Sequence, residues 1–424
     1  MILRHKRRVH LILRFCLLIV ALASVSAVDL LAEQPLTIQD CISLARESNF
    51  QLAQMRTSIQ KSNVGLLSAH SSFYPSVDFS TSYRNQGGFA GERQGSYSAS
   101  VGLNYAIYEG GYRGAAMGAA RARVEAAEEQ YRLSEAQVIL KVKEAFFRIL
   151  QKQEQVVLVE DVVKRRKEDL ILINLKYEAG RESSPAVSEA EANLLGAEYD
   201  RKRAEEELAL ARLDFNLLLG RPGRADVSLV HQDQWIEFPA LEVMVEEATA
   251  ERPELRSERA NTETLQAQLT QARSNYLPRV SASSSYQLQT SDFQEQSSNW
   301  NVGMSLSLPL FDGFARKAKV QEATLSVENQ SDRIRELEQQ IEADVEQAYS
   351  TWELARRIIE VTEATLAAAR EMYRLTKLQY EQGSTSYFFL QQKESGLTQA
   401  ENSHLAALFN LRVSTARLQK AWGG

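Results

Sequence analysis

The sequence of 424 residues predicts an α+β membrane protein built from two tandem repeats, each with the order helix, β-hairpin, long helix, helix. Three observations predict this fold class. The same short motifs recur at a constant displacement of 203 residues, and four segments alternate apolar with polar residues. Each repeat also contains a stretch of about 66 residues, 113–178 and 316–381, without proline.

The duplication is defined by motifs that match without a gap from Leu44 to Gly220. The matched pairs are Tyr74-Pro75 with Leu277-Pro278, Glu109-Gly110 with Asp312-Gly313, Gly180 with Gly383, and Gly220 with Gly423. An uninterrupted match of this length indicates that each copy is one structural unit.

Residues 1–27 have the pattern of a secretory signal peptide. Basic residues accompany an apolar stretch from Phe15 to Ala23, and Val25-Ser26-Ala27 is a plausible cleavage site. An uncleaved membrane anchor is the alternative, but the apolar stretch is shorter than the ~20 residues that a spanning helix needs. Cleavage would remove five basic and no acidic residues, which changes the formal charge from −6 to −11. This charge argues against a nucleic-acid partner.

Proline, glycine and apolar periodicity place the elements along the chain. For the first repeat, residues 28–220, we expect a helix from Thr37 to about Ser71, strands at about 77–84 and 96–107, a long helix at about 113–178 and a helix at about 185–219. Residues 221–238 link the two repeats. For the second repeat, residues 239–424, we expect strands at about 280–290 and 299–310, a long helix at about 316–381 and a helix at about 387–422.

The expected strands have one apolar and one polar face. From Tyr97 to Ile107 the odd-numbered residues are apolar or aromatic, and the even-numbered ones are Ser, Gly, Asn or Ala. One interpretation is a soluble antiparallel sheet that covers a core. We favour a membrane sheet, because the polar face has few charges and because aromatic residues stand at the ends of the apolar face, as at a lipid interface: Tyr83, Tyr97, Tyr286 and Trp300. The alternative for Tyr97 and Trp300 is a place in an ordinary core.

The number of strands has a consequence for assembly. An open sheet edge in hydrocarbon leaves backbone groups unpaired, at several kcal/mol each. The smallest closed barrels have about eight strands, and the chain supplies four. The sequence therefore predicts an oligomer in which at least two copies complete one barrel.

The long helices carry an apolar residue at every seventh position. These positions are Val142, Ile149, Val156, Val163, Leu170 and Tyr177 in the first copy, and Val345, Trp352, Ile359, Leu366, Tyr373 and Tyr380 in the second. A sustained seven-residue repeat keeps one seam against a partner helix and produces a left-handed supercoil. At 1.5 Å per residue, such a helix forms a rod of about 100 Å.

The sequence shows no pattern typical of a catalytic or metal site. The mature chain contains one cysteine, Cys41, and three scattered histidines: His70, His231 and His404. A nucleotide-binding loop and a nucleophile–base motif are absent from the sequence. We therefore expect no enzyme activity, no cofactor and no metal, and the energy for any transport must come from another protein.

The duplicated motifs also occur in a fixed order along nearly all of the mature chain. They are Ala45…Asn49…Leu52 with Ala248…Arg252-Pro253-Glu254-Leu255, Tyr74-Pro75 with Leu277-Pro278, Tyr108-Glu109-Gly110-Gly111 with Pro309-Leu310-Phe311-Asp312-Gly313, Val142…Ala145-Phe146 with Val345…Ala348-Tyr349, and the Tyr…Gly turns. This ordered set resembles the TolC-like outer-membrane efflux protein family of Gram-negative bacteria.

The resemblance implies a homotrimer with a twelve-stranded β-barrel in the outer membrane, continued by an α-helical barrel in the periplasm. It implies three kinds of partner: a periplasmic adaptor (membrane fusion) protein, an inner-membrane transporter and outer-membrane lipid. The implied function is the passive exit duct of a tripartite efflux pump or a type I secretion system, for drugs, proteins or metals. The alternative is a trimeric coiled-coil surface protein or adhesin anchored by a small barrel.

Two kinds of turn are candidate sites. Pro75, Glu109, Gly110, Pro278, Asp312 and Gly313 mark strand–helix junctions. For Glu109-Gly110 and Asp312-Gly313, helix capping and turn geometry are favoured over a binding site. Gly180 and Gly383 are expected to end the long helices as left-handed C-caps. By resemblance, these turns are the periplasmic tips that dock on the adaptor. The family often has a small apolar residue after this glycine, where this chain has Arg181 and Ser384.

The resemblance also gives positions for a pore constriction. The two aspartates that close the pore in members of the family fall on Phe389 and Gln392, so a ring of carboxylates is not supported here. Tyr387, Phe388 and Phe389 suggest either a hydrophobic constriction or packing between helices, and packing is the favoured interpretation. We expect Lys393 and Glu394 to be exposed charges.

Overall fold

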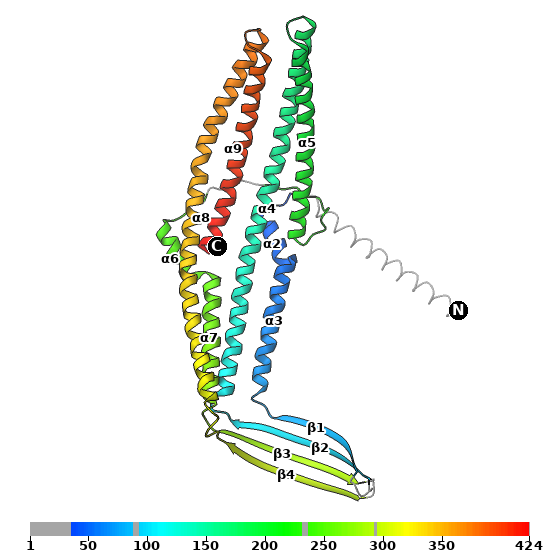
Figure 1. Ribbon diagram of the computed structural model, residues 1–424, viewed down its shortest axis with the longest axis vertical. Coiled ribbons are helices and arrows are strands. Elements are labelled where there is room, and N and C mark those ends of the chain that lie inside the picture. The colour runs from blue at the N-terminus through cyan, green and yellow to red at the C-terminus, as the bar shows by residue number, and fades with distance from the viewer. Residues whose placement is uncertain (1–34, 88–92, 231–235, 292–294, 424) are drawn as a thin grey trace, which may run out of the picture.

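The computed structural model describes residues 35–87, 93–230, 236–291 and 295–423, and the expected signal peptide lies outside them. The molecule is a long helical rod with a four-stranded sheet at one end (Figure 1). The first repeat contains α2 (Ile38–Ser48), α3 (Phe50–Ser71), β1 (Ser76–Gly87), β2 (Arg93–Tyr108), α4 (Tyr112–Glu178) and α5 (Ser184–Leu218). The second contains α6 (Leu241–Glu251), α7 (Pro253–Ser274), β3 (Arg279–Ser291), β4 (Glu295–Ser307), α8 (Ala315–Glu381) and α9 (Tyr387–Trp422).

The rod is formed by two helices of 67 residues each, α4 and α8. Along α4 lie α3 and then α5, and along α8 lie α7 and then α9 (Figure 1). Because α4 also packs on α7 and α9, the two repeats form one bundle. Within the described residues, no helix combines the length and the hydropathy needed to cross a membrane.

The sheet has the strand order β1-β2-β3-β4, with every neighbouring pair antiparallel. The pairing of β2 with β3 therefore joins the two repeats. β4 ends at Ser307, three residues before the expected end at 310. The reason is that Pro309 has no N–H to contribute to a strand ladder.

The helix expected from Thr37 to about Ser71 is divided into α2 and α3. The break lies at Asn49, whose backbone is extended with φ −69° and ψ 127°. Its side-chain oxygen accepts hydrogen bonds from the backbone N–H groups of Gln51 and Leu52, at 2.9 and 3.3 Å. Its amide donates to the carbonyl of Leu218 at 2.8 Å. Asn49 thus caps α3 and ties this break to the end of α5.

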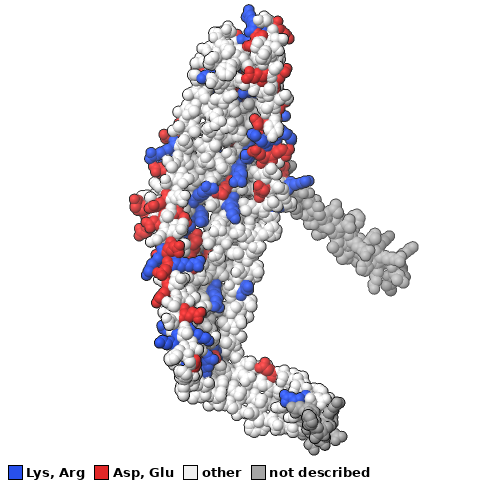
Figure 2. Space-filling view, viewed as in Figure 1, with Lys and Arg blue, Asp and Glu red and all other residues white. Residues whose placement is uncertain are grey.

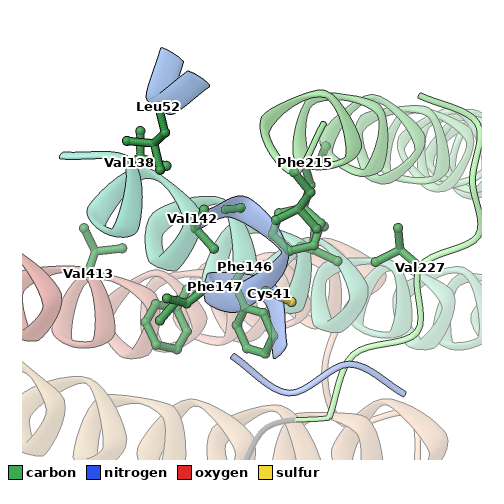
Figure 3. Packing of buried hydrophobic residues seen from close by; sticks show 14 residues of the cluster. Cys41, Leu52, Val138, Val142, Phe146, Phe147, Phe215, Val227 and Val413 are labelled. Atoms are coloured by element: carbon green, nitrogen blue, oxygen red, sulfur yellow. The ribbon is translucent and has the colours of Figure 1, made fainter. Parts of the chain in front are cut away.

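The largest buried cluster lies where α2, α4, α5 and α9 meet. Figure 3 shows Phe146, Phe147, Phe215 and Cys41 gathered there with the surrounding aliphatic side chains. The seven-residue seam is buried at most positions, but Tyr177 is 47% exposed while its counterpart Tyr380 is 1% exposed. The difference arises because Tyr380 packs on Tyr387 and Lys176 at the end of the rod.

Candidate functional site

The register of the sheet places the apolar residues on one face. One row across all four strands is Phe79, Val101, Tyr286 and Trp300, and the neighbouring row is Ser80, Ser100, Gln287 and Asn299. The apolar side chains are uncovered: Phe79 is 71% and Trp300 77% exposed. Figure 2 shows that charged side chains gather on the helices and are sparse on the part of the sheet in view. A sheet with an exposed apolar face and a polar face that carries few charges fits a boundary between lipid and a water-filled lumen.

On the polar face, serine hydroxyls pair across strands. The Oγ atoms of Ser80 and Ser100 are 2.8 Å apart, as are those of Ser82 and Ser98. Ser281 makes the same contact with Ser305 in the second hairpin. These small hydrogen-bonded side chains leave the face polar without bulky groups that project from it.

The four aromatic residues expected at the membrane interface form two facing pairs, but not at strand ends. The rings of Tyr83 and Tyr97 are 4.6 Å apart, and Tyr286 is the partner of Trp300. The expected position at the ends is wrong for Tyr286 and Trp300, which lie well inside β3 and β4. The reason is that β4 begins with the polar residues 295–299, where the apolar pattern stops but the backbone pairing continues. Trp300 is therefore the first apolar residue of β4, whereas Leu288 continues the apolar set of β3 beyond Tyr286.

The second strand–helix junction is organised by Arg316. Its guanidinium lies 2.7 Å from the carboxylate of Asp312, donates to the carbonyl of Pro309 at 2.6 Å and lies 4.9 Å from the ring of Tyr276. The carboxylate of Asp312 also accepts from the backbone N–H of Arg316 at 3.1 Å, a capping contact. The N-cap itself is Phe314, in a left-handed conformation with φ 72°.

The first junction repeats this arrangement with Arg113. Its guanidinium lies 3.2 Å from Glu109, donates to the carbonyls of Ile107 and Ser72, and stacks 5.3 Å from the ring of Phe73. Glu109 therefore contributes to the junction through its ion pair with Arg113, and the N-cap of α4 is Gly111. These two arginines are matched at the displacement of 203 residues, although neither was among the site residues expected from the sequence.

The remaining junction residues set the path of the chain. Pro75 and Pro278 stand directly before β1 and β3. Gly110 and Gly313 have left-handed φ values of 61° and 64°. A Cβ atom on Gly110 would lie 2.7 Å from the Cβ of Leu277, so a side chain here would push the two junctions apart. These positions are therefore structural turns.

We expect Arg316→Ala to destabilise the folded protein by about 2–3 kcal/mol, because it removes a nearly buried guanidinium and leaves the carboxylate of Asp312 and the carbonyl of Pro309 without this donor. The measurement is the melting temperature of the purified protein in detergent. The control is Arg335→Ala on the same helix, whose ion pair with Asp332 is largely exposed and should contribute almost nothing. Equal effects of the two substitutions would contradict this role of Arg316.

The two turns at the far end of the rod have the same hydrogen-bonding pattern and similar backbone angles. Gly180 and Gly383 have left-handed φ values of 67° and 78°. The next residue closes each turn: the N–H of Arg181 donates to the carbonyl of Lys176 at 2.8 Å, and that of Ser384 to Gln379 at 2.9 Å. This is the Schellman end of a helix, which requires glycine at this position. The side chains of Arg181 and Ser384 are exposed.

Behind these turns, Tyr380 joins the two helical hairpins. Its hydroxyl donates to the carboxylate of Glu182 at 3.0 Å, and the Nζ of Lys176 lies 3.8 Å from the centre of its ring. Burial raises the pKa of Tyr380, and the hydrogen bond to Glu182 raises it further. Tyr387 packs on the same ring and accepts a hydrogen bond from Asn193 at 3.3 Å.

The candidate constriction residues divide into two groups. Tyr387 is 3% exposed and belongs to the core of the tip, so its side chain does not share the exposed surface of Phe388 and Phe389. Phe388 and Phe389 are 63% and 52% exposed, with their rings 5.9 Å apart edge to face. Gln392 is exposed one turn further along α9. The phenylalanines are unpacked within one chain, in contrast to the packing interpretation favoured from the sequence.

A buried group of charges connects α4, α8 and α9 a few turns behind the tips. The expectation that Glu394 is exposed is wrong, because it is 0% exposed. An Arg166 nitrogen lies 2.9 Å from one Glu394 oxygen, and an Arg165 nitrogen 3.9 Å from the other. Across from them, the Nζ of Lys377 lies 3.9 Å from Asp169. Within the described part of the chain, the carboxylates of Glu394 and Asp169 have no hydrogen-bond partner.

The electrostatics of this group follow from its burial. Loss of water raises the pKa of Glu394 to about 7, although the guanidinium of Arg166 works in the opposite direction. Burial likewise raises the pKa of Asp169, against the charge of Lys377. Tyr373 lies in the same group, and burial raises the pKa of its hydroxyl. The junction between the two helical hairpins is therefore held by charges that are costly to keep ionised.

A sheet with a lipid-facing side and two unpaired edges, joined to a long helical rod, defines one subunit of an oligomeric membrane channel. The family model described as "Outer membrane efflux protein" matches residues 41–221 and 244–424. The chain therefore belongs to the outer membrane efflux protein family, and it is a protein of the outer membrane.

Curated relatives include both secretion and efflux proteins. Protein CyaE of Bordetella pertussis is 26% identical over 379 residues, which is 87% of this chain and 79% of that protein. The alkaline protease secretion protein AprF of Pseudomonas aeruginosa is 25% identical over 306 residues, 69% of this chain and 62% of that protein. The crystal structure of CusC superposes with a TM-score of 0.81 at 18% identity, over 91% of this chain and 92% of that one.

These findings confirm the family resemblance, the tandem-repeat fold class and the outer-membrane location that the sequence predicted. They also confirm the class of function, an outer-membrane duct, and they give no support to the adhesin alternative.

Proposed function

We propose that three copies of this chain close a twelve-stranded barrel in the outer membrane and form a passive exit duct. The observation that carries this proposal is the open sheet: β1 and β4 are its edges, and its apolar face is exposed. Pairing of each β1 with the β4 of a neighbouring copy removes every edge, which hydrocarbon requires. The polar serine-rich face then lines the lumen, and the exposed apolar face contacts lipid.

The aromatic residues fit the two boundaries of the membrane in this arrangement. Tyr83, Tyr97, Tyr286 and Trp300 lie toward the outer end of the apolar band. From Trp300 to Ser307 the strand is about 23 Å long at ~3.3 Å per residue, which gives a height of about 18 Å at a tilt of about 40°. The exposed residues Leu308 and Leu310 extend the apolar set toward the ~25 Å height of the apolar band in outer-membrane barrels. At the other limit, Phe311 and Phe314 are 78% and 69% exposed beside the junction with α8.

The far end of the rod is proposed to meet the partners. The exposed turns at Gly180 and Arg181, and at Gly383 and Ser384, would dock on a periplasmic adaptor, which connects the duct to an inner-membrane transporter that supplies the energy. The exposed residues Phe388, Phe389 and Gln392 would narrow the pore at this end, with Tyr387 as the packed support behind them. The names of AprF and CusC include secretion and cation efflux, so both kinds of cargo are open to test.

The test uses two adjacent residues on opposite faces of β3. Ser283 lies in the polar row with Asn104 and Gly303, while Ser284 pairs with Leu103 and Val302 on the apolar face. In cells that produce Ser283→Cys, a bulky water-soluble maleimide should enter the lumen and block it. The measurement is sensitivity to toxic compounds or export of a secreted protein, compared with a deletion strain.

Ser284→Cys is the matched control, because the same reagent cannot reach a thiol that faces lipid. The native Cys41 is fully buried and gives little background. Labelling of Ser283→Cys without any loss of export would contradict a lumen on this face.

A further inference from the structure

Charges are rare on the polar face of the sheet. Among the residues whose side chains the structure describes, this face carries three: Asp78, Arg84 and Arg279. Arg279 is already engaged at the junction, where it donates to Asn275 at 2.6 Å and lies 5.9 Å from the ring of Tyr112. Asp78 and Arg84 are therefore the two charges of this face, in the described strands, that the architecture of the junctions does not use.

Asp78 is uncompensated. Its row across the sheet contains Gly102, Ser285 and Asn301, none of which carries a charge. Its one described hydrogen-bonding neighbour is the hydroxyl of Ser76, at 3.5 Å. Gly102, directly opposite, has open space where a side chain would stand. The carboxylate therefore projects into the space over the polar face.

Arg84 lies on the same strand and the same face, six residues nearer the hairpin end. Its partner across the ladder is Ser96, and it has no ion pair within the part of the chain that the structure describes. At ~3.3 Å per residue, the two charges are about 20 Å apart along the strand, or roughly two Debye lengths at 0.1 M salt. The positive charge therefore does not neutralise the negative one.

We propose that Asp78 determines the charge preference of the duct: three copies form a ring of carboxylates where the helical part opens into the barrel, and this ring concentrates cations there. The inference rests on the proposed function, because it needs the trimer and the polar lumen. Rings of acidic side chains favour cations in pores of many folds. Arg84 forms a second ring of opposite sign near the outer end.

The ring is tested with charged thiol reagents, whose rates report the local potential whether the far end of the duct is open or shut. Ser80 lies two residues from Asp78 on the same face and is exposed. In the Ser80→Cys protein at low salt, a cationic methanethiosulfonate should react faster than an anionic one. Asp78→Asn should lower the ratio of the two rates by about fivefold, the size expected for a few charges about 7–15 Å away in water. About 1 M salt should remove the difference, because the Debye length then falls to about 3 Å.

The opposite ring gives the matched control. Ser82 lies two residues from Arg84, so Arg84→Gln should raise the same ratio at Ser82→Cys. The proposal is overturned if Ser80→Cys reacts freely with both reagents and Asp78→Asn leaves the ratio unchanged at low salt. If neither reagent reaches Ser80→Cys while Phe79→Cys on the other face reacts, the polar face is not a lumen, and the proposed function fails with the inference.

Discussion

Val302→Arg should abolish assembly of the protein in the outer membrane. Val302 is 70% exposed on the apolar face of β4, between Trp300 and Met304. An arginine that faces lipid in an outer-membrane barrel costs about 2–4 kcal/mol at the middle of the bilayer and about 0–1 kcal/mol near its boundaries. Val302 lies two residues inside Trp300, so we expect a cost of about 2 kcal/mol for each copy. A trimer repeats that cost three times, and the total is comparable with the whole stability of many proteins. The measurement is the amount of detergent-resistant oligomer in the outer-membrane fraction.

The matched control is Asn301→Arg, at the adjacent residue on the opposite face. Asn301 is exposed and shares its row with Asp78, so the new guanidinium enters water beside a carboxylate. This variant should assemble like the wild type. Failure of Asn301→Arg together with normal assembly of Val302→Arg would show that the two faces are assigned the wrong way round.

The strands could be predicted because each strand has one apolar and one polar environment, which produces an alternating sequence pattern. Alternation of apolar and polar residues identified both hairpins and the faces of all four strands. The ends of the strands could not be read in this way. Residues 295–299 pair through their backbones but carry polar side chains on both faces, so they give no periodic signal.

Local capping and long-range contacts were harder to predict. Asn49 lies within a pattern that otherwise continues as one helix, and its hydrogen bond to Leu218 depends on a residue 169 positions away. Arg113 and Arg316 did leave a signal, since both copies carry arginine four residues after an acidic residue. The duplication, applied residue by residue, would have identified them.

Glu394 shows how a buried charge can be mistaken for a surface charge. Glu394 lies on the same stripe of α9 as Tyr387, Leu390 and Leu397. These three apolar residues are all buried. A charged residue at a seam position of a coiled coil signals a specific partner rather than solvent. The partners, Arg165 and Arg166, are on another helix and more than 200 residues away, so sequence spacing alone could not identify them.

Arg166→Ala should destabilise the helical junction by about 3–5 kcal/mol at pH 8, because it leaves the buried carboxylate of Glu394 without its nearest cation. The measurement is the melting temperature of the purified trimer in detergent. The loss of stability should be smaller at pH 5.5, because Glu394 is then protonated and carries no charge for Arg166 to neutralise. The exposed pair of Glu371 and Arg374 provides the control, since Arg374→Ala should change the melting temperature little at either pH.

The raised pKa of Glu394 also predicts the direction in which the stability of the wild-type protein changes with pH. The pKa of Glu394 is raised from 4.5 to about 7, so the folded protein binds this proton more tightly than the unfolded chain does. Stability from this group is therefore fully present below pH 4.5 and declines as the pH rises toward 7, by about 3 kcal/mol in all. Asp169, whose pKa is also raised, acts in the same direction. Glu394→Gln should make the melting temperature less dependent on pH between pH 5.5 and 8, and a wild-type curve that is already flat would contradict the raised pKa of Glu394.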